Sequence, residues 1–394
     1  MIVKNEEASL PRCLTSVKDV VEEMVILDTG STDKTMEIAQ EFGARIYHFQ
    51  WCNDFAAARN EALKYVQGEW VLVLDGDEVL TSEIVPHMQQ AMEGDNNLVI
   101  NLVRHEIEAL QSPYSLVSRL FRNHPKVKFS RPYHSMVDDS VAQLLQQESH
   151  WRVVSLTPVA ILHYGYQPEA IASLNKSIRA QQAMEGYLAS HPNDPYTCSK
   201  LAPIYIKEGQ VKKGIKLLKS GLKSNLATPG VLFELQYHLG NVYARQQNLD
   251  QAAVHYQKAI NQPILPQLKL GAYNNLGNLL MAAGDLQSAK QAYETVLKID
   301  PNFALGYYNL GMTLKAQGNF VEAITSYQEA IKLNHNYAFA YQNLGVVLLK
   351  IGNVLESLEA FKKAISLHQT NNPQEAQRLR QGLQKMGFSL DIYE

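Results

Sequence analysis

Three acidic side chains follow an apolar run near residue 75. The stretch VLVLDGDEVL, residues 71–80, places Asp75, Asp77 and Glu78 directly after four apolar residues. Side chains two apart on an extended chain point the same way, so Asp75 and Asp77 can face one target. Paired carboxylates suit a hard cation such as Mg²⁺ or Mn²⁺, which commonly binds phosphate oxygens. The other interpretation is that Asp-Gly is simply a turn, and residue type alone leaves both open.

A second polar segment, LDTGSTD at residues 27–33, also follows an apolar strand and leads into a helix. Asp28 is expected at the strand end, with its carboxylate free to accept an N–H group from a nucleotide base. Gly30 permits a tight turn, and one of the three residues after it can cap the following helix. Capping does not explain Asp28, which therefore becomes a candidate binding residue.

Strands and helices that alternate up to about residue 165 must position these groups. The expected strands are MIVK, MVILD, ARIYHF and EWVLVLD, and the expected helices are residues 7–20, residues 33–42 and DFAAARNEALKYV. This order predicts a parallel sheet covered by helices on both faces. Such a sheet binds ligands at the carboxyl ends of its strands, where Asp28 and Asp75 occur. Shorter strand-rich segments after residue 95 predict a mixed or antiparallel edge.

A helical repeat replaces this alternation from about residue 193. Three glycines recur at intervals of 34 residues, and each is followed by a small residue and then by an aromatic residue: Gly277, Ala289 and Tyr293; Gly311, Ala323 and Tyr327; Gly345, Ser357 and Phe361. This period and these small residues are typical of tetratricopeptide repeats. The small residues let two antiparallel helices approach closely, and the aromatic side chain is expected to fill the gap to the next repeat. We expect about five repeats and a polar helix at residues 373–386 that caps the open end.

The composition excludes several classes of protein. The chain has 394 residues, 46% of them hydrophobic and 19% charged, which predicts a soluble protein of two or three domains. A net charge of -3 gives no electrostatic reason to expect nucleic acid or an anionic membrane as a partner. Cys13, Cys52 and Cys198 form neither a metal pattern nor a disulfide framework, which favours a reducing, cytoplasmic compartment.

Neither a membrane span nor a signal peptide is expected. No stretch approaches the ~18 apolar residues that a transmembrane helix needs, and the N-terminal residues lack the pattern of a secretory signal. The first strand begins at Met1 itself, so we expect the native strand to be longer at its start.

The motifs MIVKNEE, VILDTGSTDKT, FQWCNDFAAARNEAL and WVLVLDGDE, in this order over residues 1–82, resemble those of family 2 glycosyltransferases. The resemblance extends to HYGY at residues 163–166, and the chain also resembles the subset in which tetratricopeptide repeats follow the transferase domain. It implies an α/β GT-A fold, with a Rossmann-like mixed sheet, followed by an all-α TPR solenoid. The expected divisions are a transferase domain, a linking helix, the repeats, and a capping helix with a tail, at residues 1–167, 168–192, 193–370 and 371–394.

The resemblance implies roles for individual residues. The nucleotide-binding residues would be those that line the nucleoside pocket, contact the base or lie beside the diphosphate: Asn5, Glu6, Asp28, Arg59, Asn60 and Asp75. The metal ligands would be Asp77, as the firmer ligand, Asp75, which also lies near the ribose, and His163. His163 ends the apolar strand VAILH, where GT-A enzymes often supply a third metal ligand, and a strand-end histidine bonded to backbone is the alternative.

The catalytic base is the least defined part of the site. Related sequences usually have glutamate after the histidine that corresponds to His134, but this chain has Ser135. An inverting transfer needs a base that takes the proton of the acceptor. Asp138 and Asp139 follow closely and are the candidates, with Glu106 as another possibility; such acids are also often only solvated loop residues.

Two arginines match the R-L-F-R motif that is usual in the family. Arg119 and Arg122, in SRLFRN, would either stabilise the departing diphosphate or only bridge to the sheet. Residue types alone leave these two roles open.

The expected function is metal-dependent, inverting transfer of a sugar from a UDP-linked donor, with Mn²⁺ or Mg²⁺ as cofactor. The repeats would recruit a peptide, protein or glycan acceptor, or a partner protein. One alternative is an interaction protein whose transferase domain is inactive, which the Ser135 departure would suit. A nucleotidyltransferase also uses paired acids and a metal, but the Gly-rich basic loop it normally carries near the first strand is missing from MIVKNEE.

Overall fold

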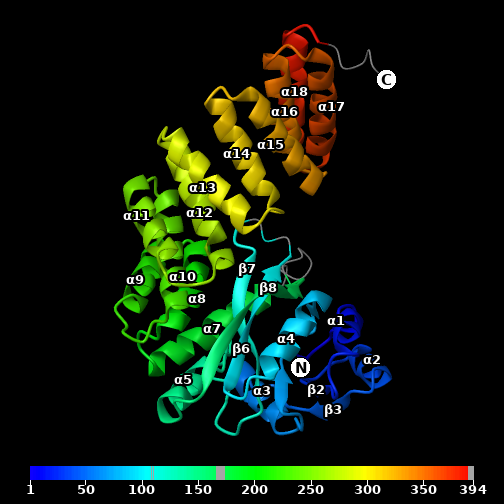
Figure 1. Cartoon of the computed structure of the whole chain (residues 1–394), viewed down its shortest axis with the longest axis vertical. Coiled ribbons are helices and arrows are strands. Elements are labelled where there is room, and N and C mark those ends of the chain that lie inside the picture. Colours follow the sequence, from blue (N-terminus) through cyan, green and yellow to red (C-terminus); the bar gives the residue numbers. More distant parts are fainter. Residues whose placement is uncertain (108, 110, 166–173, 389–394) are drawn as a thin grey trace. The chain divides into compact units, whose positions relative to one another are not determined.

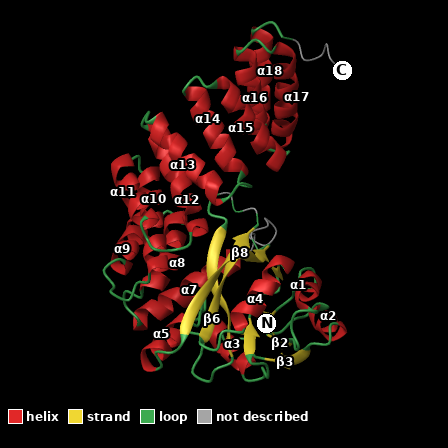
Figure 2. Ribbon diagram, viewed as in Figure 1, coloured by secondary structure: helices red, strands yellow, loops and turns green. Residues whose placement is uncertain are grey.

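The computed structural model describes residues 1–107, 109, 111–165 and 174–388 (Figure 1). The chain divides into two compact units, Met1–His238 and Leu239–Glu394. The first unit combines strands with helices, whereas the described part of the second unit is helical (Figure 2). The start of the expected linking helix, at residues 168–173, and the end of the C-terminal tail lie outside the described residues.

Two sheets form the centre of the first unit. The smaller sheet is parallel, with its strands in the order β1 (Ile2–Val3), β2 (Val25–Asp28) and β3 (Arg45–His48). The larger sheet has the order β4 (Trp70–Leu72), β7 (Tyr114–Arg122), β6 (Asn97–Glu106), β8 (Arg152–His163) and β5 (Glu78–Leu80). In it β6 and β8 run parallel and the other neighbours are antiparallel. The mixed sheet expected of a GT-A fold is therefore confirmed.

The fourth strand differs from its prediction. We expected EWVLVLD to continue the parallel sheet, but β4 pairs with β7 in antiparallel register, and Val73 N still donates to Arg119 O at 2.8 Å. An apolar run shows that a strand is buried on both faces but does not identify its neighbour. The pairing with β7 brings Arg119 to the end of β4, next to Asp75.

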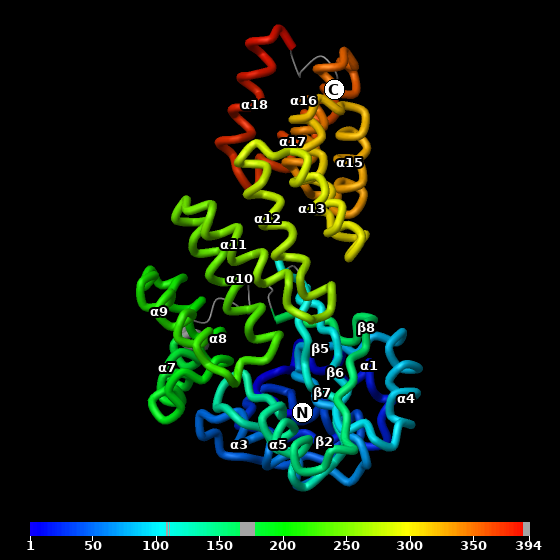
Figure 3. Tube along the Cα trace, turned by 60° about the vertical axis from the view of Figure 1, so that its left-hand side comes forward, coloured from blue at the N-terminus to red at the C-terminus, as the bar shows by residue number. Residues whose placement is uncertain are grey.

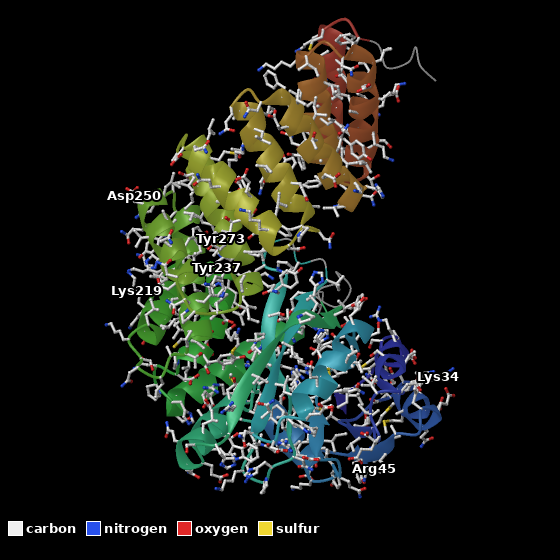
Figure 4. All side chains as sticks on the ribbon, viewed as in Figure 1. Lys34, Arg45, Lys219, Tyr237, Asp250 and Tyr273 are labelled. Atoms are coloured by element: carbon white, nitrogen blue, oxygen red, sulfur yellow. The ribbon has the colours of Figure 1, made fainter. Side chains whose placement is uncertain are left out.

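Helices cover both faces of the larger sheet. They are α1 (Leu10–Val17), α3 (Phe55–Leu63), the 3₁₀ turn Ser82–Ile84, α4 (Val85–Met92) and α5 (Asp138–Gln147), while α2 (Thr35–Glu41) packs on the smaller sheet. One core cluster joins α1 and α4 to the sheet through residues such as Val17, Met88 and Leu102. The other joins α3 and α5 to it through residues such as Ala56 and Leu144. Lys34, which precedes α2, points away from this core into solvent (Figure 4).

Helix pairs follow the transferase fold along the chain. After α7 (Leu174–Ser190), the described residues form five pairs: α8 (Pro195–Lys207) with α9 (Val211–Gly221), α10 (Pro229–Arg245) with α11 (Leu249–Ile260), α12 (Leu270–Ala282) with α13 (Leu286–Ile299), α14 (Ala304–Ala316) with α15 (Phe320–Leu333), and α16 (Ala338–Lys350) with α17 (Val354–Asn371). A short 3₁₀ turn, Pro266–Lys269, precedes α12. The last helix, α18 (Pro373–Lys385), packs against α17 and closes the series (Figure 3).

The repeat glycines accept an aromatic ring from their own repeat. A Cβ atom added at Gly277 would lie 2.7 Å from Tyr293, and one added at Gly311 would lie 2.7 Å from Tyr327. The ring also reaches the next repeat as expected, since Tyr327 packs in one buried cluster with Leu344 and Val347 of α16. The ring lies over the missing side chain of the preceding helix, which explains why both residue types recur together.

Among the described residues, no helix has both the length and the apolar character needed to cross a bilayer. Cys13, Cys52 and Cys198 are all free thiols, and only Cys52 is exposed.

Candidate active site

The Asp75 carboxylate lies between two buried arginines. Its Oδ1 accepts from Arg59 Nη2 at 2.8 Å, and its Oδ2 accepts from Arg119 Nη2 at 2.7 Å. Burial by itself would raise the pKa of Asp75, but the charges of Arg119 and Arg59 outweigh it and hold that pKa well below its usual range. Asp75 is thus a fixed anion at the end of the β4 segment. The two guanidinium groups concentrate positive charge where a diphosphate is expected to bind.

A buried glutamate fixes the turn that follows. The Glu78 side chain is fully buried, and its Oε2 accepts from the backbone N–H of Asp75 at 2.8 Å. Its Oε1 pairs with Arg104 Nη1 at 2.9 Å. The third acid of the motif is therefore a structural residue that closes the Asp75–Glu78 turn, and binding by Asp75 and Asp77 stays a prediction.

Asp77 projects from this turn toward the end of β8. Its Oδ2 lies 3.4 Å from His163 Nε2, while His163 Nδ1 is hydrogen-bonded to Glu106. Gly165 closes over the pair, since a Cβ atom there would lie 2.8 Å from Asp77 Oδ2. Burial lowers the pKa of His163, but the hydrogen bonds to Asp77 and Glu106 outweigh it and raise that pKa to about 9.

This arrangement would suit a divalent cation once the cation displaces the Nε2 proton that His163 shares with Asp77. A ligating histidine usually donates its other ring N–H to a carboxylate, as His163 does to Glu106. Mg²⁺ is often held by one or two carboxylates together with substrate phosphates. The described residues contain no cluster of three or more acidic, histidine or cysteine ligands, so phosphate oxygens would have to complete the coordination of a cation at Asp77 and His163.

The residues expected at the nucleoside lie together at the ends of β1 and β2. Asn5 Oδ1 accepts from Thr32 N at 2.8 Å, and the Glu6 side chain packs against Gly76, where an added Cβ would lie 3.0 Å away. Asp28, by contrast, does not have a free carboxylate. Its oxygens accept the backbone N–H groups of Gly30 and Ser31, each at 3.0 Å.

The hydrogen bonds of Asp28 indicate a structural role for its carboxylate. Burial raises the pKa of Asp28, but bonds from Ser31 and Gly30, with a contribution from His48, outweigh it and lower that pKa. Asp28 is therefore an anion that shapes its own turn, because short polar side chains commonly bond the backbone two or three residues on. A contact between Asp28 and a nucleotide base would add to these bonds and remains a prediction.

The pair Arg59 and Asn60 holds a loop at the site. Arg59 Nη1 donates to the carbonyl and the hydroxyl oxygen of Ser135, both at 2.9 Å. Asn60 exchanges two hydrogen bonds with the backbone of Phe129, at 2.8 and 2.9 Å. Residues 130–137, which we name the acceptor loop, are thereby anchored to α3. Ser135, which stands where relatives usually have glutamate, is a buried partner of Arg59.

The two candidate bases have different surroundings. Asp139 is paired with Arg131 and accepts from Ser130. Asp138 Oδ1 accepts from Ser118 Oγ at 3.0 Å, whereas its Oδ2 is buried without a hydrogen-bond partner among the described residues. Burial raises the pKa of Asp138 above its ordinary value, although the bond from Ser118 opposes the shift.

The remaining candidate residues, Arg119, Arg122 and Glu106, have different partners. Arg119 lies at Asp75, but Arg122 donates to Asn97 O at 2.9 Å and lies 4.8 Å from the Trp70 ring, so it bridges to the sheet. Glu106 is committed to His163, and it pairs with Arg104 at 2.8 Å. Arg122 therefore has the structural role that we considered, and stabilisation of a departing diphosphate by Arg119 stays a prediction.

Sequence patterns did not reveal that the first repeat reaches the site. Arg131 of the acceptor loop pairs with Asp194 at 2.7 Å, at the start of α8. Tyr196 and Lys200 of α8 follow, and Glu234 of α10 pairs with Lys200 at 2.6 Å. No local signal marks these residues, because they occupy ordinary helical positions more than 50 residues after the acceptor loop.

Comparisons with known proteins agree with this architecture. The profile of the family described as Glycosyl transferase family 2 matches residues 1–154. Tetratricopeptide repeat profiles match residues 234–263, 277–318, 311–352 and 340–371. A TPR repeat-containing protein of Synechococcus elongatus is 43% identical over 301 residues, which cover 76% of this chain and 75% of that protein.

One further relative and one solved structure match parts of the chain. The SPbeta prophage-derived glycosyltransferase SunS of Bacillus subtilis is 39% identical over 85 residues, which cover 21% of this chain and 20% of SunS. The solved structure of YrrB, described as a TPR protein with an unusual peptide-binding site, aligns with a TM-score of 0.43 at 18% identity. That alignment covers 52% of this chain and 100% of YrrB.

Proposed function

Since the chain belongs to glycosyltransferase family 2, with tetratricopeptide repeats after the transferase domain, and is a glycosyltransferase, we propose that it transfers a sugar from a UDP-linked donor with inversion. The observation that carries this proposal is the position of Asp75 between Arg59 and Arg119, two residues before Asp77. The uracil base of the donor would lie near Asp28, Asn5 and Glu6. The diphosphate of the donor would lie near the two arginines and Asp77.

A divalent cation, Mn²⁺ or Mg²⁺, would be held by Asp77 and His163 and would supply charge neutralisation for the leaving diphosphate. Asp75 is already bonded to two arginines, so we assign it to orienting these groups and the ribose rather than to direct coordination. This narrows the expected ligand set of Asp75, Asp77 and His163 to two members. Arg59 and Arg119 would stabilise the same leaving charge through hydrogen bonds.

Asp138 is the base that we favour. In the transfer step an acceptor hydroxyl oxygen forms a bond to the anomeric carbon, and its proton passes to the Asp138 carboxylate. The bond between the anomeric carbon and the donor phosphate oxygen breaks, and its electron pair leaves with the diphosphate. The unpaired Oδ2 and the raised pKa of Asp138 support this assignment, whereas Asp139 is held by Arg131.

Matched variants test the base. Asp138→Asn should lower the rate of transfer at saturating donor and acceptor by ~10²-fold or more, since general base catalysis typically contributes that much. It should leave UDP affinity unchanged. Asp139→Asn, one residue away, should change the rate much less; an equal loss in both variants, or none in Asp138→Asn, would exclude Asp138 as the base.

The donor site is tested by thermal unfolding with and without metal. UDP with Mn²⁺ should raise the melting temperature more than UDP with a chelator, because the cation and the diphosphate bind together. Ligand at about 100 times its dissociation constant should add ~2.7 kcal/mol to the free energy of unfolding. If no nucleoside diphosphate gives a metal-dependent shift, the donor and metal parts of the proposal are wrong.

The repeats would recruit the acceptor, which we expect to be a peptide, protein or glycan, or they would recruit a partner protein. Solenoids of this kind present extended surfaces for binding. The three free thiols agree with a reducing compartment, and we therefore propose a cytoplasmic location.

A further inference from the structure

One helix of the first repeat is rich in lysine and lacks acidic residues. α9 has the sequence VKKGIKLLKSG, and Lys223 follows two residues after its end. Residues 207–223 contain six lysines, no arginine and one acidic residue, Glu208. The net charge of -3 for the whole chain is an average that does not describe this basic segment.

Most of these lysines form a stripe on one side of α9, which we name the lysine stripe. Its members recur at intervals of four, three and four residues, the spacing of one helical face, and the last lies in the turn after the helix: Lys212, Lys216, Lys219 and Lys223. All four side chains are exposed, and Lys219 points outward from the repeat (Figure 4). The opposite side packs closely on α8, since a Cβ atom added at Gly214 would lie 2.5 Å from Ile206. This packing holds the lysine stripe toward solvent.

The lysines work against the stability of the helix that carries them. Like charges three or four positions apart repel one another on a helix surface. Lys212 and Lys213 also lie in the first turn, where the helix dipole favours acidic residues and α9 has none. Lys213 has a partner in Glu185 at 3.4 Å. The side chains of Lys212, Lys216 and Lys223 make no ion pair or hydrogen bond with the described residues, so an anionic partner would compensate for charges that the fold leaves unpaired.

Two apolar features lie beside the lysine stripe. Leu226, in the loop just after the stripe ends, has 79% of its surface exposed. A groove of about 500 Å³ between α7, α8 and α9 is lined by Lys216 together with apolar side chains such as Leu188 and Leu217. The acidic side chain of the groove, Glu185, is the one already paired. The basic surface therefore adjoins apolar side chains that water does not satisfy.

We propose that the lysine stripe and Leu226 form a surface that docks the protein on an anionic lipid membrane. The lysines would attract the phosphate and carboxylate groups of the lipids, and Leu226 would enter the apolar boundary beneath them. A basic helix face beside exposed apolar residues is typical of proteins that lie on a membrane surface. The cytoplasmic leaflet carries such anionic lipids. This inference goes beyond the proposed glycosyl transfer and does not depend on it.

The residue types favour a membrane over a protein or a nucleic acid as the partner. Arginine binds a carboxylate or phosphate through a fixed pair of hydrogen bonds, whereas lysine is a hydrated point charge on a flexible stem. Lysine is accordingly depleted at protein–protein interfaces and arginine is enriched. Nucleic-acid surfaces usually add aromatic or arginine side chains that contact bases, and residues 207–223 contain neither. A fluid layer of lipid headgroups can adapt to the spacing of flexible lysines.

Vesicle binding of the full-length protein tests this surface. The probes are phosphatidylcholine vesicles with about 30% phosphatidylserine and vesicles of phosphatidylcholine alone, and bound protein is measured by co-sedimentation. We expect binding to the anionic vesicles only, and binding should weaken as added salt screens the exposed charges. Absence of binding to anionic vesicles, or equal binding to both kinds, would overturn the inference.

A triple variant tests the stripe itself. Lys212→Gln/Lys216→Gln/Lys223→Gln should lower the partition coefficient on the order of 100-fold, because each lysine contributes about fivefold, or ~1 kcal/mol, near an anionic surface. The variant should keep its fold, since glutamine and lysine have similar helix propensities and the repulsion between lysines is reduced. Leu226→Gln should lower the partition coefficient by about tenfold through the loss of apolar burial.

Three exposed lysines on other repeats provide the matched control. Lys258→Gln/Lys298→Gln/Lys363→Gln makes the same change in net charge on α11, α13 and α17 and should leave vesicle binding nearly unchanged. An equal loss in both triple variants would show a dependence on net charge alone and would overturn the assignment to the stripe. Tighter binding of a duplex oligonucleotide or of polyglutamate than of anionic vesicles, at the same salt, would overturn the choice of a membrane. UDP titration of the wild-type protein tests the proposed function separately.

Discussion

The contact between Arg131 and Asp194 allows a quantitative test of how the first repeat is attached. Arg131 Nη2 and Nε approach the two Asp194 oxygens at 2.7 and 3.2 Å, and only 7% and 12% of the two side chains are exposed. Asp194 Oδ1 also caps α8 by accepting from Thr197 N at 2.8 Å. One carboxylate therefore performs two functions, and substitutions can separate them.

Asp194→Ala removes both functions. Breaking a buried ion pair costs ~3–5 kcal/mol, and Arg131 keeps Asp139 as a partner, so we take about 3 kcal/mol for the pair. Loss of the cap adds ~1 kcal/mol. Asp194→Asn should cost only the ion pair, about 3 kcal/mol, because asparagine caps helices as well as aspartate does.

Tryptophan fluorescence reports the unfolding of the unit Met1–His238 selectively. Trp51, Trp70 and Trp151 are the chain's three tryptophans, and all lie within Met1–His238. With a slope of about 3 kcal/mol per molar urea, a loss of about 4 kcal/mol should lower the midpoint of the fluorescence transition by about 1.3 M. Asp285→Ala, which removes a similar cap from α13 in the other unit, should barely move this midpoint.

The pH dependence provides a second check on the same pair. Burial raises the pKa of Asp194, but bonds from Arg131 and Thr197 outweigh it and hold that pKa below the ordinary value of 3.8. A lowered pKa contributes stability that is present above 3.8 and is lost as pH falls through the folded-state value. The difference between wild type and Asp194→Asn should therefore be full at pH 7 and should shrink below pH 3.8. A midpoint for Asp194→Asn that equals wild type at pH 7 would refute the reasoning.

Three further substitutions test other parts of the structure. Asp77→Asn should abolish the Mn²⁺-dependent part of the stabilisation by UDP and leave the fold intact, and equal stabilisation in the variant would show that Asp77 only forms a turn. Asp28→Ala should weaken UDP binding in isothermal titration at unchanged metal dependence, and identical affinity would exclude contact with the base. Gly311→Ala would place a Cβ 2.7 Å from Tyr327 and should cost ~1–3 kcal/mol in helix unfolding followed by circular dichroism. Gly382→Ala, which meets no atom within 4 Å, should not destabilise the same unit, and equal effects would refute the close-packing explanation.

Local patterns predicted the parts of the molecule that are built from short-range rules. The 34-residue spacing of Gly277, Gly311 and Gly345 predicted the helix pairs, because each glycine makes room for a ring only 16 residues later. The spacing of Asp75 and Asp77 predicted two carboxylates that can face one target, but the turn directs Asp75 to two arginines and Asp77 to His163. The geometry of the repeats lies within two neighbouring helices, whereas that of the acidic motif does not lie within one strand.

The rest of the site depends on contacts between distant segments, which no window of sequence contains. Arg59 meets Ser135 across 76 positions, and Arg119 meets Asp75 across 44. Arg119 reaches Asp75 because β4 pairs with β7, and the apolar sequence of β4 does not indicate which strand it pairs with. Asp28 shows that a local contact can be missed as well. Its carboxylate accepts from the backbone N–H groups of Gly30 and Ser31, a short-range bond that the sequence permitted and that we did not expect.

The acceptor loop connects the donor site to the first repeat through a continuous series of polar contacts. Asp75 bonds Arg59, Arg59 bonds Ser135, and four positions earlier Arg131 bonds Asp194. Arg131 and His134 adopt left-handed backbone conformations, with φ of +70° and +50°.

Each such residue costs on the order of 1 kcal/mol, so the loop keeps this shape only where its surroundings impose it. α3 imposes it from one side and α8 from the other. Because the base candidate Asp138 begins the helix directly after the loop, a change in how the first repeat is held would move the acceptor side of the site while Asp75, Asp77 and His163 stay in place. The compact unit Met1–His238 accordingly contains the first helix pair together with the acceptor loop, and the expected division at residue 192 stays a prediction.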